Sequence, residues 1–220
     1  MKRDSCLLQK TLHPIAHKAC GVQEKFDVVF AVDASNQNVM INQIAGFVRA
    51  FMRSFTLSKD RTRFGMLLYD SDSVSDILSL EMGVTAGSVE NALTSIRTLG
   101  GQRGLHRLPD YVMRMFFTPA SRRSGAKRIL VVMTTGFNEN SAQSEAFDQE
   151  AVNIFKEMRS PSSGVDVVTM VIDNKEFQTR ASDVMSDPKD VILMQNTLGF
   201  PRYLGDLEQI VGYKRGIYVL

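Results

Sequence analysis

The hydrophobic pattern is organised around residues 26–37, where an apolar run rich in β-branched side chains leads directly into a polar turn. Such a run is typical of a buried strand, and the turn carries Asp33, Ser35 and Gln37. Over residues 39–55 apolar side chains recur every three or four positions, which predicts an amphipathic helix that packs on a sheet. This order places the turn at the carboxyl edge of the sheet, where open α/β sheets bind ligands.

Strand and helix patterns alternate along the rest of the chain. The pattern predicts strands at residues 62–69, 74–80, 128–134, 165–172 and 191–195, and helices at residues 85–99, 105–117, 142–159, 179–185 and 203–211. The helix at 85–99 has Thr85 as its expected N-cap and Gly100-Gly101 as its expected end. The strand at 74–80 has mixed polarity and is expected to pair antiparallel at the sheet edge. The sequence therefore predicts an α/β fold, a doubly wound, mostly parallel six-stranded sheet with one antiparallel edge strand and helices on both faces.

The chain of 220 residues, 44% of them hydrophobic, suits one domain over residues 25–220 with an extension over residues 1–24. Both cysteines, Cys6 and Cys20, lie in the extension. They suit a disulfide in a secreted chain, and two free thiols in a cytosolic tail are the alternative. No apolar run is long enough to span a membrane and residues 1–20 lack a signal-peptide core, so we expect a fragment of a longer chain.

Bulk electrostatics point to no particular partner. The formal net charge of +2 is near balance, so neither nucleic acid nor an anionic membrane is expected to bind. A local basic cluster, Arg122, Arg123, Lys127 and Arg128, could contact heparin-like polyanions or could form a solvated loop.

Catalytic motifs are not recognisable in the sequence. It has no Gly-x-Ser-x-Gly elbow and no glycine-rich phosphate loop followed by Lys-Ser/Thr. The only histidines are His13, His17 and His106, and no cysteine or carboxylate in the predicted core has a metal-ligand spacing. We therefore expect neither an enzyme nor a structural zinc site, and no cofactor.

The run Asp33-Ala34-Ser35-Asn36-Gln37 after an apolar strand resembles the Asp-x-Ser-x-Ser loop of von Willebrand factor A domains. The predicted edge hairpin, the Gly100-Gly101 turn and the Met133-Thr134-Thr135-Gly136 turn extend the resemblance over roughly residues 25–215. The sequence is most similar to the extracellular matrix branch of the family, the A domains of collagen VI chains and matrilins. The resemblance implies a Rossmann-like fold and a metal-ion-dependent adhesion site at the carboxyl edge.

Three positions depart from the cation site that the resemblance implies. Gln37 replaces the second serine of the first loop, Gly104 stands where the second loop has a threonine, and Thr135 stands where the third loop has an aspartate. Only Asp33 and Ser35 remain, and one negative charge cannot offset the dehydration of Mg²⁺. We predict a degenerate site without a functional cation, the alternative being a weak site built from Asp33, Ser35, Thr135 and waters.

An unpaired Asp33 at the rim of an apolar sheet would be costly, and the second loop carries Arg103, His106 and Arg107. We hypothesise that Arg103 or Arg107 pairs with Asp33, since a guanidinium group satisfies a carboxylate with two hydrogen bonds. The alternative is that both arginines are solvated.

The leading functional prediction is a non-enzymatic interaction or assembly module of an extracellular matrix protein, independent of metal, that binds other matrix proteins or neighbouring chains of the same assembly. One alternative is a cation-dependent adhesion domain that binds a ligand carboxylate. Another is an intracellular scaffold domain.

Overall fold

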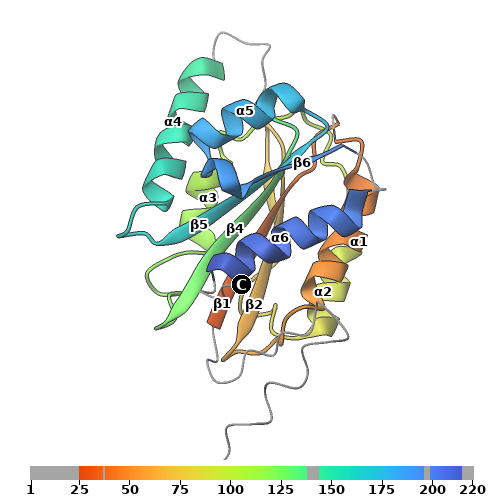
Figure 1. The fold of residues 1–220 in the computed structure, drawn as a ribbon, viewed down its shortest axis with the longest axis vertical. Helices are drawn as coiled ribbons and strands as arrows, with labels where there is room; N and C mark the ends of the chain where they lie inside the picture. Colours follow the sequence, from red (N-terminus) through yellow and green to blue (C-terminus); the bar gives the residue numbers. More distant parts are fainter. Residues whose placement is uncertain (1–24, 37, 138–143, 196–198, 215–220) are drawn as a thin grey trace, which may run out of the picture.

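A six-stranded sheet forms the centre of the protein in the computed structural model, which describes residues 25–36, 38–137, 144–195 and 199–214 (Figure 1). The strand order is β3-β2-β1-β4-β5-β6, and only β3 runs antiparallel to its neighbour. The strands are β1 (Lys25–Asp33), β2 (Thr62–Tyr69), β3 (Val74–Leu78), β4 (Ala126–Thr134), β5 (Val165–Ile172) and β6 (Val191–Met194). The predicted fold class is confirmed.

Strand β1 lies in the middle of the sheet and is buried on both faces. It pairs in parallel with β2 on one side and with β4 on the other. Alternate side chains point to opposite faces of a strand, so Val28 and Phe30 enter different cores from Val29 and Ala31. This two-sided burial explains why the run is continuously apolar rather than alternating.

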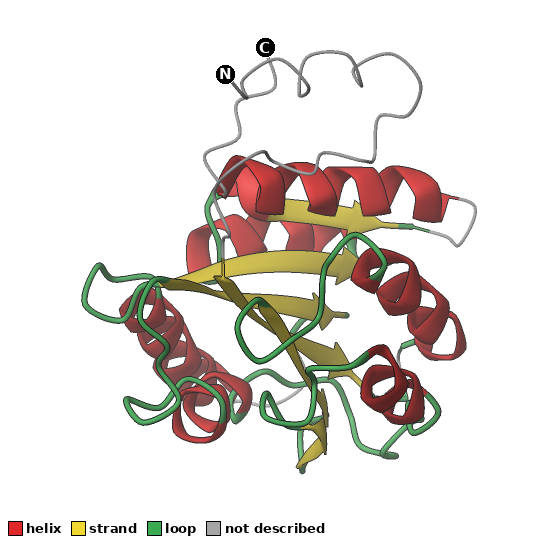
Figure 2. Cartoon of the chain, turned by 90° about the horizontal axis from the view of Figure 1, so that it is seen from below, coloured by secondary structure: helices red, strands yellow, loops and turns green. Residues whose placement is uncertain are grey.

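Helices cover both faces of the sheet, as Figure 2 shows from below. The helices are α1 (Ile41–Met52), α2 (Ala86–Leu93), α3 (Leu108–Met115), α4 (Ser144–Met158), α5 (Lys175–Val184) and α6 (Phe200–Lys214), with the short 3₁₀ helix η1 (Pro188–Asp190) before β6. Helices α1, α2 and α6 pack on the face that carries Phe30, and α3, α4 and α5 pack on the face that carries Val29. None of the described helices is long and apolar enough to span a bilayer.

The largest differences from the predicted helix boundaries are at the end of α2 and at the start of α5. The helix predicted at 85–99 begins after Thr85, whose hydroxyl accepts a hydrogen bond from the Ser88 amide, but it ends at Leu93. It cannot continue to Gly100, because the amide of Leu99 donates to the carbonyl of Ala34 (2.8 Å) at the end of β1. The helix predicted at 179–185 begins earlier, at Lys175, because the Asn174 side chain caps it.

A buried ion cluster closes the amino end of the sheet. The carboxylate of Asp27, at the start of β1, accepts two hydrogen bonds from Arg63 (2.7 and 2.9 Å). Arg123 also donates to this carboxylate (2.6 Å) and to the carbonyls of Phe26 and Arg61 (2.7 and 2.9 Å). The loop around Arg123 is therefore fastened to the strand ends.

Because of this cluster, the predicted basic patch is less exposed than the sequence suggests. Arg123 points inward, and Arg128 is buried, with its guanidinium group over the Phe117 ring and donating to the Phe117 carbonyl (3.2 Å). Burial, together with the charge of nearby Arg122, lowers the pKa of Arg128. Two of the four residues considered for polyanion contact are thus committed to the protein interior.

Candidate functional site

The carboxyl edge of the sheet brings together the ends of β1, β2 and β4, as predicted. The loop after α2 reaches this edge, because the Asn36 amide donates to the carbonyl of Gly101 (3.1 Å) and the Ser71 amide to the carbonyl of Gln102 (2.9 Å). Asp33, Ser35, Arg103, Gly104 and Thr135 consequently lie in one region, while Gln37 falls outside the described residues.

The carboxylate of Asp33 is buried and fully occupied by hydrogen-bond donors from the chain itself. Its Oδ1 accepts from the Ser35 amide (2.9 Å), and its Oδ2 accepts from the Thr135 amide (2.8 Å) and from the Thr135 hydroxyl. The Asn38 side chain donates to the Asp33 carbonyl. These bonds tie the end of β1 to the loop that follows β4.

Tyr69 lies beneath this carboxylate in the apolar core. Its hydroxyl donates to the carbonyl of Met133 (3.2 Å), so it links β2 to β4. Burial, with a smaller contribution from the charge of Asp33, raises the pKa of Tyr69 well above its ordinary value. The phenol is therefore a permanent hydrogen-bond donor and takes no part in acid–base chemistry near neutral pH.

The predicted ion pair between Asp33 and an arginine is wrong. Arg103 donates to the carbonyl of Thr135 (3.3 Å), and Arg107 is exposed and donates to His106 Nε2 (3.4 Å). Asp33 does not need a cation, because the Thr135 hydroxyl and two backbone amides already compensate its burial. Arg103 thus contacts the loop that holds Asp33 but does not pair with the Asp33 carboxylate.

Two asparagines that the sequence analysis did not single out hold the site. Besides the Asn38 bond to Asp33, Asn174 donates to the Thr135 carbonyl (2.7 Å) and accepts from the Phe177 amide (2.9 Å). Asn174 lies two residues after the end of β5 and immediately before α5. Its residue type was the available signal, since asparagine is a preferred N-cap.

A divalent cation fits this arrangement poorly. The Ser35 hydroxyl is the one buried side-chain oxygen, within the described residues, that has no hydrogen-bond partner, so it could ligate an ion. At Gly104, however, a Cβ atom would lie 3.0–3.1 Å from Ser71, so a ligand side chain at this position would require Ser71 to shift. In the described part of the chain no three histidine, cysteine or acidic side chains cluster as metal ligands do. The donor set does not suit Mg²⁺, which prefers several oxygen ligands in octahedral geometry.

Replacing Ser35 with alanine tests this arrangement. Because the buried hydroxyl has no partner among the described residues, Ser35→Ala should leave the free energy of unfolding unchanged or raise it by up to about 1 kcal/mol in urea titrations with EDTA. The matched variant Thr135→Val removes a hydroxyl that donates to a buried carboxylate and should lower that free energy by about 1.5–3 kcal/mol. A clear loss of stability in Ser35→Ala would show that the hydroxyl has a partner.

Asp70 holds a second network at the same edge. Its carboxylate accepts hydrogen bonds from the amides of Asp72, Ser73 and Gly101 (2.9, 2.8 and 2.9 Å). Burial favours the neutral acid, but these bonds to the ionised form outweigh it and lower the pKa of Asp70. The carboxylate thereby fastens the β2–β3 turn to the loop after α2.

The lowered pKa gives a testable acid dependence. The unfolded chain binds a proton at Asp70 near pH 4, above the pKa of the folded state, so this contribution to stability is complete above that pH and is lost as the pH falls through the folded pKa. In unfolding titrations from neutral to acidic pH, Asp70→Asn should flatten part of this decline. Parallel pH profiles of the variant and the original chain would contradict the assignment.

Comparison with known proteins agrees with this geometry. A model of the von Willebrand factor type A domain family matches residues 27–199. The transmembrane cell adhesion receptor mua-3 of Caenorhabditis elegans is 26% identical over 152 residues, an alignment that covers 62% of this chain and 4% of the receptor.

Solved structures share the fold at low sequence identity. Proximal thread matrix protein 1 from the mussel byssus, in a form with a zinc-occupied adhesion motif, has a TM-score of 0.70 at 18% identity, covering 86% of this chain and 48% of that one. The manganese-loaded TRAP protein of Plasmodium vivax has a TM-score of 0.66 at 15% identity, covering 87% and 75%. The chain thus spans about half the length of the thread protein.

Proposed function

The chain belongs to the von Willebrand factor type A domain family, and from this premise we propose that it is a metal-independent interaction module of an extracellular matrix or adhesion protein, without enzymatic activity. Domains of this family are commonly adhesion or assembly modules in extracellular proteins. The module would bind other matrix proteins or neighbouring chains of its own assembly, as the collagen VI-like branch suggests.

One observation carries the metal-independent part of the proposal. Both oxygens of the Asp33 carboxylate accept hydrogen bonds from the chain, and the Thr135 hydroxyl is one of the donors to Oδ2. At the outer side of this edge Arg103 and Arg107 supply positive charge and Val39 is 70% exposed. A partner would meet a mixed cationic and apolar surface there rather than an open coordination position.

The alternative is a cation-dependent adhesion domain. The unpartnered Ser35 hydroxyl favours it, as does the bound metal in the two structural relatives. Gln37, Gly104 and Thr135 oppose it, since Gln37 and Gly104 lack the hydroxyl group, and Thr135 lacks the carboxylate, that the family has at these positions. The intracellular scaffold is the third reading.

Titration calorimetry of Mg²⁺ and Mn²⁺ into the full chain tests the proposal directly, with thermal melts in metal and in EDTA. We expect no binding heat and the same melting temperature in both conditions. A ligand that binds the folded state must raise the melting temperature. A rise with millimolar metal would therefore replace the proposal with the cation-dependent alternative.

Thr135→Asp provides the matched positive control. The new carboxylate lies against Asp33, so like charges should lower stability in EDTA, and Mn²⁺ should restore part of it. A metal response in this variant but not in the original chain would show that the assay detects binding and that Thr135 is what prevents it.

The extracellular location can be tested through Cys6 and Cys20, which lie outside the described residues. We propose that they form a disulfide in the native protein. Alkylation of native material before reduction, followed by peptide mass spectrometry, should find a Cys6–Cys20 pair. Complete alkylation of both thiols would favour the intracellular reading.

A further inference from the structure

Within the described residues, the sheet ends at β6. This strand is the last in the strand order, and its one partner among the described strands is β5. At the other side of the sheet the last strand is β3, whose pairing with β2 is interrupted by a register shift between Met66 and Leu67. β6 is the regular edge of the sheet, and unpaired strand edges readily pair with another chain.

The direction of the backbone groups of β6 follows from two hydrogen bonds. The Met194 carbonyl accepts from Asp173 (2.8 Å) at the end of β5, so the polar groups of Met194 and Ile192 face β5. Successive residues of a strand point their backbone groups in opposite directions, so Val191 and Leu193 face outward. The Gln195 amide also faces outward, where the Tyr203 hydroxyl of α6 accepts its hydrogen bond (3.1 Å).

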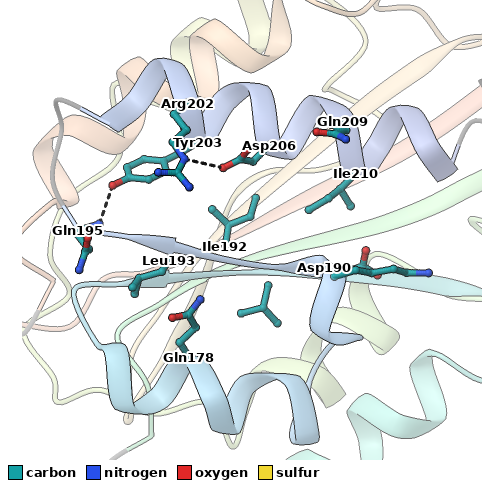
Figure 3. Close-up of a pocket in the computed structure, with 12 residues that line it drawn as sticks. Gln178, Asp190, Ile192, Leu193, Gln195, Arg202, Tyr203, Asp206, Gln209 and Ile210 are labelled. Atoms are coloured by element: carbon teal, nitrogen blue, oxygen red, sulfur yellow. Dashed lines mark hydrogen bonds and ion pairs between the residues drawn. The ribbon is translucent and has the colours of Figure 1, made fainter. Parts of the chain in front are cut away.

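A groove of about 590 Å³ runs along this edge between α5 and α6 (Figure 3). Ile192 lies on its α6 side and Leu193 on its α5 side. The groove is apolar along the strand and carries one opposite pair of charges on α6, Arg202 and Asp206 (3.8 Å apart). The Arg202 side chain is 84% exposed, so it is available to a second charge.

We propose that β6 is the contact edge between two copies of this chain. The two β6 strands pair antiparallel across a two-fold axis at Ile192, and Val191 of each copy lies opposite Leu193 of the other. The Val191 amide already donates to the Pro188 carbonyl at the end of η1. Across the axis the Leu193 amide of each copy therefore donates to the Val191 carbonyl of the other, which gives two backbone bonds related by the two-fold axis. Gln195 keeps its bond to Tyr203.

The charge pattern is complementary to itself in this arrangement. In the proposed arrangement the two α6 helices run antiparallel beside each other, so the exposed Arg202 of one copy can approach Asp206 of the other. On each side α6 contributes one basic and one acidic residue, and Lys189 and Asp190 add one more of each to the groove, so the contact surface carries equal numbers of opposite charges.

A second copy fits the edge better than a single extended peptide. Specific interfaces bury about 1,200–2,000 Å², and a peptide paired with the four-residue strand β6 would bury much less. A second copy adds contacts between α6 helices.

The residues that follow α6 are also disfavoured as the occupant. α5 and α6 pack on opposite faces of the sheet, so a strand added beyond β6 after α6 would complete a crossover of opposite hand to β5–α5–β6. Left-handed crossovers are rare.

Sedimentation velocity of the full chain, in reducing buffer to prevent intermolecular disulfides, measures the dimer. We expect a concentration-dependent monomer–dimer equilibrium that is unaffected by EDTA. No metal titration enters this measurement, so the two proposals fail separately. If the chain does not dimerise, the proposed interaction function still stands. If the domain binds metal, the proposed dimer still stands. A monomer up to high micromolar concentration would overturn the inference.

Leu193→Pro removes only the outward-facing amide, since proline is tolerated on edge strands. Both backbone bonds across the axis are lost by symmetry, so the dimer dissociation constant should rise about tenfold or more, with the monomer's melting temperature nearly unchanged. Leu193→Val keeps the amide and should keep the dimer. If Leu193→Pro unfolds the chain, the test of the dimer rests on the charge variants of Arg202 and Asp206.

Charge reversal gives a second, surface-only test. Arg202→Asp and Asp206→Arg should each weaken the dimer about tenfold, because four like charges then meet at the axis, and the double variant should restore it. If both single variants and the double variant have the dissociation constant of the original chain, the two copies contact each other through another surface.

Hydrogen exchange of the Leu193 amide should slow as the dimer forms. Full protection in the monomer would mean that another part of the chain covers the edge and would also overturn the inference.

Discussion

Replacing Asp27 with asparagine is expected to lower the free energy of unfolding by about 3–5 kcal/mol in urea titrations. The Asp27 side chain is 2% exposed, and those of Arg63 and Arg123 are 10% and 16% exposed. Without the carboxylate two nearly buried guanidinium groups would face each other, and the counter-charge left near Arg63 among the described residues would be the largely exposed Glu81, 4.0 Å away. The hydrogen bond to Asp27, although burial opposes it, raises the pKa of Arg63 in the original chain. In the variant both arginines keep their charge, because a guanidinium group does not lose its proton in proteins.

The neighbouring Arg122 provides the control for this prediction. Arg122 is exposed and has the same charge as Arg123 in the same loop, so Arg122→Ala should change the free energy of unfolding by no more than about 0.5 kcal/mol. Arg123→Ala should fall between the two variants, because Arg63 would remain paired with Asp27. Equal effects of Arg122→Ala and Arg123→Ala would contradict the inward role of Arg123.

The second large effect is expected at Gly83, where alanine should lower the free energy of unfolding by about 3 kcal/mol. A Cβ atom at this position would lie 1.6 Å from the carbonyl oxygen of Phe64 and 2.6 Å from its carbonyl carbon. Backbone atoms of a buried strand cannot rotate away, so the loop must move and lose the hydrogen bond from the Phe64 amide to the Gly83 carbonyl (2.8 Å). Thermal or urea unfolding of Gly83→Ala measures the loss.

The same substitution at Gly87 should have the opposite sign. Gly87 lies in α2 and is exposed, and a Cβ atom added there would have no neighbour within 4 Å outside the backbone of its own helix. Alanine there should stabilise the domain by about 0.5–1 kcal/mol, because it restricts the unfolded chain and favours the helix. Destabilisation of both variants to the same extent would mean that the close approach at Gly83 is not the cause.

The central sheet could be predicted from local patterns. Strands β1 and β4 are buried on both faces, so their sequences are continuous apolar runs, and β3 shows its edge position in its mixed polarity. The end of α2 could not be predicted in this way. Residues 94–99 keep a helical apolar spacing, but a tertiary hydrogen bond from Leu99 to Ala34 determines their path.

The sequence predicted where the site lies but not which groups bond to Asp33. Loop position brought Asp33, Ser35 and Thr135 together as expected. Charge alone suggested an arginine partner for Asp33, yet the short Thr135 side chain reaches the carboxylate first and leaves Arg103 to the neighbouring carbonyl. Such competition depends on distances of a few ångströms across separate loops, which local sequence patterns do not contain.

The ion cluster at the other end of the sheet was not predicted for a related reason. Asp27 was part of an apolar strand pattern, and Arg123 was part of a basic loop. They are 96 residues apart in the chain, and only the parallel pairing of β1 with β4 brings them together.

The central place of β1 has a mechanical consequence. Tension applied to the chain at Lys25 pulls along the axis of a strand that is hydrogen-bonded to parallel neighbours on both sides. Force in this direction shears the two ladders together instead of opening one bond after another, and Asp27, held by two arginines, sits where the force enters. The domain is therefore built to resist stretching through the strand at which its fold begins.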